Sequence, residues 1–273
     1  MAIREFWLKN SKSSDNLYYF QNGTVKVFLN NPTGLGMSQS LTTTQYADVL
    51  TGVSSQNFAQ VGGEVLFWND SNATKYDNYN KFVEFLTHTP LTLFYQIPTS
   101  PAQTYSMDVE VLSLDKTEVK TDGLLRCNFS LQGLSRWQGA EVTKTGTASS
   151  YSITNNGHLP CGFTIEINGT SMKNPYITLT QDNEMYGEAK FDDSTGFSKV
   201  FVNSRDGEQE VILEQGGSVL PNPLSYQDLS ISNGAIYVTF VKLARGTSTL
   251  AIGMDSGSIT GVTIKHTPLY RSV

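Results

Sequence analysis

Charged residues are scarce in this sequence of 273 residues. Asp, Glu, Lys and Arg make up 16%, against about 25% in typical soluble domains. The hydrophobic content, 38% before the 23 glycines are added, is ordinary, and aromatic residues make up 11%. Disordered chains show the opposite composition, rich in charge and poor in aromatic residues. Disorder of the whole chain is therefore excluded, and uncharged polar residues are expected to cover packed surfaces.

Basic residues are also few. The chain carries 19 Lys and Arg against 25 Asp and Glu, a formal net charge of -6. The deficit is spread evenly, with 10 basic and 12 acidic side chains in residues 1–140, and 9 and 13 in residues 141–273. Proteins that bind the nucleic-acid backbone show clustered Lys and Arg. We therefore expect no nucleic-acid partner.

Cysteine and long apolar runs are scarce as well. Cys127 and Cys161 are the two cysteines. Residues 1–6 lack the apolar stretch of about 7–15 residues that a secretory signal contains, and no run approaches the ~20 apolar residues of a membrane span. We expect assembly in a reducing cytosol, both cysteines as buried thiols, and no membrane insertion.

Catalytic motifs are absent from the sequence. His88, His158 and His266 lie far apart and in no metal-binding pattern, and there is no nucleophile elbow, phosphate loop or dinucleotide fingerprint. The chain is therefore not expected to be an enzyme. No catalytic residue, cofactor or metal is assigned.

Carboxylate pairs leave two minor alternatives open. A glycosidase uses two carboxylates, and calcium needs several oxygen ligands. Both features occur here in polar, loop-like sequence, where solvated turn residues are the default. The residues concerned are Asp182 with Glu184, Asp192 with Asp193, and Asp206-Gly207-Glu208.

One segment has a clear helical period. Apolar residues recur at spacings of three and four, which predicts an amphipathic helix over about 73–88 with its stripe toward the core. Residues 70–72 are capping types, and Pro90 ends the pattern. His88 is expected on the last turn, where a cation suits the helix dipole. The stripe consists of Tyr76, Tyr79, Phe82, Val83, Phe85 and Leu86.

The remainder of the first half predicts strands. Apolar runs surround an Asn22-Gly23 hairpin turn, and partly alternating runs follow the helix up to residue 131. Together they predict an antiparallel sheet with the helix packed on one side. Residues 33–63 are apolar at modest density and rich in glycine, so they predict either an extended arm or an ordinary pair of strands with a long loop.

The composition changes after Trp137. Residues 139–150 are mostly Gly, Thr, Ser and Ala, which predicts a linker. Beyond it, many short β runs separated by turns predict a β-sandwich. The expected domains are therefore 1–138, of the α+β class, and 151–273. The expected turns of the second half are Asn156-Gly157, Asn168-Gly169, Asp206-Gly207 and Asn233-Gly234.

In the first half, the Lys116-Thr117-Glu118 turn is followed by a strand and by Ser135-Arg136-Trp137. This arrangement resembles the distal tail (Dit) proteins of long-tailed siphovirus bacteriophages that infect Gram-positive bacteria. The second half is similar to the galectin-like sandwich of the family. Its matching pieces are Phe163-x-Ile165-x-Ile167-x-Gly169, Asn174-Pro175-x-Ile177-x-Leu179 and Val241-x-Leu243-x-Arg245-Gly246.

The resemblance implies a mainly β fold, with an N-terminal α+β domain followed by a galectin-like β-sandwich. It implies a structural role in the baseplate at the tail tip of the virion, after assembly in the host bacterial cytoplasm. N-terminal domains would close a hexameric ring, alone or stacked. The implied partners are the tail tube protein, a tail-tip fibre or lysin, and a receptor-binding or upper baseplate protein.

The 33–63 arm and the tryptophans are the candidate contacts. An extended arm can add strands to a sheet of a neighbour. Tryptophan anchors interfaces, although it is more often a core residue. The candidate contact residues are Leu35, Met37, Leu41, Tyr46, Val49, Leu50, Phe58, Trp7, Trp68 and Trp137.

A carbohydrate-binding module for cell-wall glycans is the alternative function. Such sandwiches usually present exposed aromatic platforms, and the second half contains no Trp. Tyrosine would have to take that role. The candidate platforms are Tyr151, Tyr176, Tyr186 and Tyr226.

Overall fold

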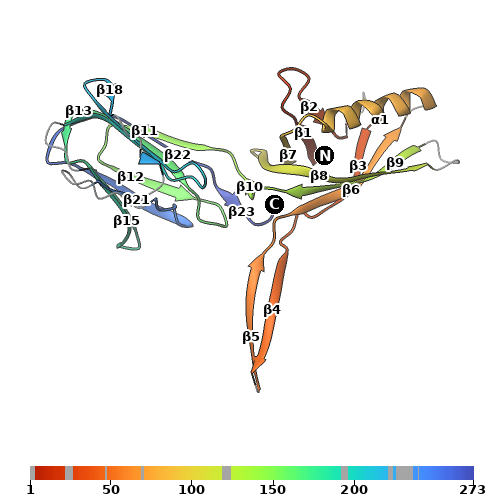
Figure 1. The fold of residues 1–273 in the computed structure, drawn as a ribbon, viewed down its shortest axis with the longest axis horizontal. Helices are drawn as coiled ribbons and strands as arrows, with labels where there is room; N and C mark the ends of the chain where they lie inside the picture. Colours follow the sequence, from red (N-terminus) through yellow and green to blue (C-terminus); the bar gives the residue numbers. More distant parts are fainter. Residues whose placement is uncertain are drawn as a thin grey trace. The chain divides into compact units, whose positions relative to one another are not determined.

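A computed structural model describes most of the chain, in two compact units (Figure 1). The first unit contains residues 1–139 and 270–273, and the second contains residues 140–269. The described residues form one helix and antiparallel strands, so the predicted mainly β fold is confirmed. Backbone alone is described at 46, 49–51, 54, 72, 118, 224–225 and 236–238. The described residues are 4–21, 27–46, 48–68, 71–118, 124–191, 196–220, 224–225, 236–238 and 240–273.

The first unit is built on a large antiparallel sheet. Seven strands follow the order β2-β1-β7-β8-β9-β6-β3, and β10 pairs with both β8 and β23. Alternation fixes the two faces, because Phe6 and Leu8 of β1 are buried while Trp7 between them is not. The strands are β1 (Glu5–Lys9), β2 (Leu17–Tyr19), β3 (Val27–Thr33), β6 (Gln60–Trp68), β7 (Leu91–Ile97), β8 (Gln103–Glu118), β9 (Leu124–Gly133), β10 (Trp137–Gln138) and β23 (Leu269–Tyr270).

Helix α1 spans Asn72–Leu86 and packs on β6 and β9. It ends earlier than the predicted 88, because its last turn tightens. The N–H groups of Thr87 and His88 bond to the carbonyls three residues back, at 3.1 and 3.3 Å. His88 therefore follows the helix, and the prediction that placed it on the last turn is wrong.

The predicted apolar stripe of α1 is buried at its C-terminal end and exposed at its start. Phe82, Phe85 and Leu86 belong to the core of the first unit. Tyr76 is 39% exposed, which the prediction missed. Its ring instead faces the surface, where the Lys116 ammonium lies 5.1 Å from the ring centroid, a cation–π contact.

Phe82 is the centre of an aromatic cluster in the first core. Its ring lies 4.7 to 5.9 Å, centroid to centroid, from four other rings. The cluster joins the helix to the sheet, because Phe82 lies on α1 while three of its neighbours lie on β2, β6 and β9. The four neighbours are Tyr18, Phe20, Phe67 and Phe129.

The second unit is a β-sandwich with one core. Inward residues such as Ile165, Ile167, Leu250 and Ile252 are buried from both sheets, as alternation requires. One sheet contains β11 (Val142–Gly146), β22 (Ser256–His266), β13 (Phe163–Lys173), β16 (Phe197–Asn203), β17 (Glu210–Gln215), β18 (Ser218–Val219) and β19 (Leu224–Ser225). The other contains β12 (Ser150–Asn155), β21 (Gly246–Gly253), β14 (Tyr176–Gln181), β15 (Glu184–Phe191) and β20 (Ile236–Val238).

The chain between the two predicted domains is not a linker over 139–150. Val142–Gly146 forms β11, which pairs with β22 along five residues. Its side chains are all exposed, so no apolar pattern marked the strand in the sequence. The last four residues also differ from the prediction, since 270–273 belong to the first unit.

One predicted turn of the second unit is a β-bulge. Asn168-Gly169 lies within β13, where the register with β22 shifts. A Cβ at Gly169 would lie 2.4 Å from the carbonyl oxygen of Ser258, so the close approach of two strands requires glycine there. The other turns at Asn156-Gly157 and Asp206-Gly207 lie between strands, while Asn22-Gly23 and Asn233-Gly234 lie outside the described residues.

We expect Phe82→Ala to destabilise the first unit by about 3–5 kcal/mol, because a fully buried ring leaves a cavity. All three tryptophans (Trp7, Trp68 and Trp137) lie in the first unit, so tryptophan fluorescence during urea unfolding reports on it. Tyr76→Ala, at an exposed position of the same helix, is the matched control. Equal midpoints for the two variants would contradict the prediction.

Acid is expected to destabilise the second unit through His266. Burial lowers the pKa of this imidazole below its ordinary value of 6.5, although the bond to the Thr154 carbonyl and the charge of Glu141 oppose the shift. Nε2 lies 3.2 Å from that carbonyl oxygen, which can only accept, so Nε2 is protonated. The unfolded state then binds a proton more readily, and stability is lost as pH falls below 6.5.

Calorimetry between pH 7.5 and 5.5 checks this sign. We expect His266→Gln, which keeps a donor toward the Thr154 carbonyl, to flatten the pH dependence of the second unit. His158→Gln, at an exposed position of the same unit, serves as the control. A wild-type slope in the His266 variant would rule the imidazole out as its source.

Candidate assembly surface

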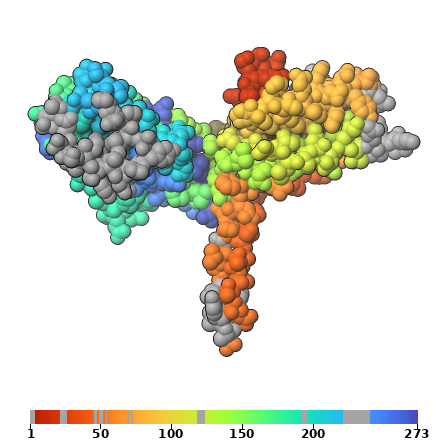
Figure 2. Space-filling model, in the orientation of Figure 1, coloured from red at the N-terminus to blue at the C-terminus, as the bar shows by residue number. Residues whose placement is uncertain are grey.

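A two-stranded hairpin extends from the first unit. Strands β4 (Gln39–Tyr46) and β5 (Val49–Gln56) pair with each other from Gln39 opposite Gln56 to Tyr46 opposite Val49. No other described strand joins this ribbon, and Figure 2 shows it, in orange, as a thin ribbon. Leu41 and Val53 are 65% and 76% exposed. These apolar side chains sit in water on a ribbon that lies outside the core.

Arg136 fixes the base of the hairpin. Its guanidinium donates to the backbone carbonyls of Asn57, at 2.7 Å, and of Gln56, at 3.1 Å. It also lies 4.5 Å from the centroid of the Phe58 ring. The Asn57 N–H closes the base by donating to the carbonyl of Ser38 at 3.1 Å. Arg136 therefore holds the β5 end of the ribbon, and the bond between Asn57 and Ser38 joins that end to the β4 end.

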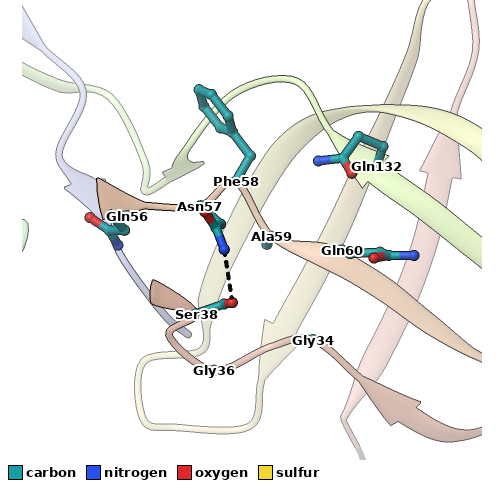
Figure 3. Close-up of a pocket in the computed structure, with 9 residues that line it drawn as sticks. All are labelled: Gly34, Gly36, Ser38, Gln56, Asn57, Phe58, Ala59, Gln60 and Gln132. Atoms are coloured by element: carbon teal, nitrogen blue, oxygen red, sulfur yellow. Dashed lines mark hydrogen bonds between the residues drawn. The ribbon is translucent and has the colours of Figure 1, made fainter. Parts of the chain in front are cut away.

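A cavity of about 590 Å³ lies beside this base (Figure 3). Residues 34–38 frame one side of it and residues 56–60 the other, and side-chain amides predominate in its lining. At Gly34 the backbone has φ +80°, and a Cβ would lie 1.8 Å from the Gln60 carbonyl oxygen, so only glycine fits. The lining residues are Gly34, Gly36, Ser38, Gln56, Asn57, Phe58, Ala59, Gln60 and Gln132.

The last residues of the chain also contact this region of the first unit. The N–H of Val273 donates to the Leu35 carbonyl at 3.1 Å, and the Tyr270 ring packs edge-on against Tyr105 at 5.1 Å. Leu35 is half-buried and packs against the core. These contacts join residues 238 and 165 positions apart, so sequence patterns gave no sign of them.

The three tryptophans have three different environments. Trp137 is 1% exposed and packs near Tyr95, so it is a core residue and is removed from the candidate contacts. Trp68, at the end of β6, is 48% exposed. Trp7 is half-buried on the outer face of β1.

Trp7 is the centre of a row of stacked rings across three strands. It pairs with Tyr19 of β2 and with Phe94 of β7, and its ring lies 5.8 and 5.2 Å from theirs. Leu17 and Tyr19 on the edge strand are each 44% exposed. We call Tyr19, Trp7 and Phe94 the aromatic ladder. Trp7 is one of the candidate contacts, whereas Tyr19 and Phe94 were missed because the register between strands is not visible in the sequence.

The remaining predicted contacts follow the hairpin and its base. Met37 and Phe58 are 54% and 47% exposed. Of Tyr46, Val49 and Leu50 only the backbone is described, at the far end of the ribbon. The projecting segment is therefore shorter than the predicted arm of 33–63, since residue 33 belongs to β3 and residues from 60 onward belong to β6.

Titratable groups form no reactive site in the described residues. No group of three or more His, Cys, Asp and Glu there could hold a metal ion. Burial raises the pKa of the Cys127 and Cys161 thiols to about 11, which makes them unreactive. Asp182 and Glu184 are exposed in and beside a turn, and Asp192 and Asp193 lie outside the described residues.

The charges near residue 206 are satisfied within the protein. The Asp206 carboxylate accepts from the Lys242 ammonium at 2.8 Å. Among the described helices, none is long and apolar enough to cross a membrane. What the chain presents to its surroundings is therefore a projecting ribbon and sheet faces. Among the described residues, the class of site that the fold offers is a contact surface.

Comparison with known families gives that class a name. Residues 5–134 match the family described as distal tail protein, N-terminal domain, so this part of the chain belongs to the distal tail protein family. The family predicted from the sequence is confirmed, and with it the role of a structural component of a phage tail baseplate. No curated protein sequence matches the chain.

Solved structures share the fold at low identity. The Dit protein of phage SPP1, described as a paradigm of the hub adsorption apparatus in phages infecting Gram-positive hosts, is 14% identical with a TM-score of 0.67. The match covers 96% of this chain and 98% of that one. A chain of the phage P2 baseplate in its activated conformation with calcium is 13% identical, with a TM-score of 0.56 and 100% coverage of both chains.

We expect Arg136→Ala to loosen the hairpin. Two hydrogen bonds of ~0.5–1.5 kcal/mol each are lost, so hydrogen exchange at the Asn57 amide should accelerate by roughly tenfold. Arg126→Ala, which breaks the 3.4 Å ion pair with Glu64 on the same sheet, is the control. Unchanged exchange in the Arg136 variant, measured by mass spectrometry of peptides spanning 38–57, would refute the clamp.

Proposed function

We propose that this chain is the ring-forming hub of its baseplate, with the first unit closing a hexameric ring, alone or stacked. The observation that carries the proposal is the match of residues 5–134 to the distal tail protein N-terminal domain. The folds it shares support the same role, since one belongs to a hub adsorption apparatus and another to a baseplate. The role is structural and not enzymatic.

The hairpin β4–β5 is the element best suited to join neighbouring copies. An isolated two-stranded ribbon is marginally stable in water, and this one exposes Leu41 and Val53. Contact with a neighbour would remove those side chains from water. Because a ring is built from head-to-tail contacts, each copy would both extend a hairpin and receive one.

The two units would then divide the work between ring and partners. The first unit would contact the tail tube protein and the tail-tip fibre or lysin along the ring axis. The second unit, as the galectin-like sandwich, would face the receptor-binding or upper baseplate protein. On its surface β12 and β21 carry the uncharged, Ser- and Thr-rich composition that suits protein contacts, at Ser152, Thr154, Thr247 and Thr249.

A second function, glycan binding, depends on Tyr176. Tyr151 is buried, and the hydroxyl of half-buried Tyr186 donates to Ser248. Tyr226 lies outside the described residues. Tyr176 is 40% exposed, with its ring over Gly253, which resembles a stacking platform. Glycan-array binding by the full chain, lost in Tyr176→Ala, would favour this function, and no binding would reject it.

The mass of the assembly that the full chain forms in solution tests the proposed ring. We expect the full chain in native mass spectrometry or light scattering at about six times the 30.1 kDa of one copy. Replacing residues 40–55 by an Asn-Gly turn, which suits the paired ends Gln39 and Gln56, should give monomers. Their tryptophan unfolding midpoint should stay at the wild-type value.

Val219→Ser, at a 56% exposed site of the second unit, is the control and should keep the ring. A wild-type chain that stays monomeric at high concentration, and also binds neither tail tube nor baseplate proteins, would refute the proposed function.

A further inference from the structure

The hairpin of a ring must have a receiving surface on the next copy. This inference rests on the proposed function. A head-to-tail ring needs two different surfaces on each protomer, because the contact is not made between identical patches. The hairpin supplies one surface. The receiving surface must therefore lie elsewhere on the chain.

The aromatic ladder has the character of such a surface. Tyr19, Trp7 and Phe94 stack across β2, β1 and β7 on the face opposite the core. Phe6 and Leu8, which alternate with Trp7, are 1% and 0% exposed, so the ladder contributes nothing to that core. Rigid aromatic rings at a surface are the residues that most often anchor protein interfaces.

The position of the ladder makes it accessible. β2 ends the strand order of the sheet on that side among the described strands. Leu17 and Tyr19 on it are each 44% exposed. The next outward positions of β7, Thr92 and Gln96, are uncharged. On β1 the outward neighbours of Trp7 are Glu5 and Lys9, both exposed, so a ribbon that follows the ladder meets three rings with one charge of each sign on either side.

The hairpin matches the ladder in chemistry and size. Neither β4 nor β5 contains a charged residue, and interface cores are likewise depleted in charge. Each strand has eight residues, so the ribbon is about 26 Å long, whereas the ladder spans two strand spacings, about 10 Å. The ribbon is therefore long enough to cross all three rings.

Charge at the rims is also complementary. Asp48, in the turn of the hairpin, is exposed, and Lys9 at the end of β1 is exposed beside Leu17. A rim pair of this kind adds little affinity but helps to fix orientation. We propose that the hairpin of one copy docks across the aromatic ladder of the next, with the face of the ribbon that carries Leu41 against the rings and Val53 on the opposite face.

Mixing two variants tests this pairing. Tyr19→Glu places a charge on the ladder at an exposed edge position, and the double variant Leu41→Glu with Val53→Glu places charges on the hairpin. We expect each alone to lose the ring. Mixed in equal amounts, they should form dimers of about twice the 30.1 kDa of one copy, because one intact hairpin meets one intact ladder.

The outcomes separate the inference from the proposed function. Tyr76→Glu, at a 39% exposed tyrosine of the same unit, should keep the ring. If Tyr19→Glu also keeps it, or if the mixture stays monomeric, the ladder does not receive the hairpin while the ring itself stands. If the wild type forms no ring, the proposed function fails first.

Cross-linking gives a second measurement that does not depend on losing the ring. Cys127 and Cys161 are buried, so added cysteines would be the reactive thiols. With a short bismaleimide, the double variant Leu17→Cys with Leu41→Cys should give a series of covalent multimers, and each single variant none. Cross-links from position 17 to added tail tube protein, and none between copies, would overturn the inference.

Discussion

Strand alternation is the constraint on which the first unit depends. A side chain on β1 or β7 faces either the core or the outside, and the register leaves no third option. Phe6 and Leu8 fill the core with 1% and 0% exposure, so Trp7 must be outside. The aromatic cluster around Phe82 and the aromatic ladder consequently lie on opposite faces of one sheet. Once the residues of the core face are set by alternation, the residues of the outer face are set as well.

The same alternation explains what the sequence could reveal. Patterns of period 2 and 3.6 are local, so they predicted most of the strands and helix α1. They failed where the pattern was absent or the contact distant. All five residues of β11 are exposed, so no alternation of apolar and polar residues indicated this strand. The Arg136 clamp spans 79 positions to Asn57, and the ladder depends on registers between three strands.

Trp137 shows why residue type alone misleads. Tryptophan is frequent both in cores and in interfaces, and Trp7, Trp68 and Trp137 could each be assigned either way from sequence. Burial separates them, because only Trp137 is enclosed, at 1% exposure. For the hairpin, the modest apolar density of residues 33–63 left two alternatives open, an extended arm or an ordinary pair of strands with a long loop.

Low charge and low identity have one physical origin. The SPP1 Dit protein shares the fold at 14% identity and a TM-score of 0.67, so the fold does not depend on most of the individual residues of this chain. An outward face carries no packing constraint from the core and can change to match its neighbours. A face that meets protein over most of its area loses charge, because an unpaired charge buried in an interface is costly. In the proposed ring the hairpin strands, which contain no charged residue, would be such a face.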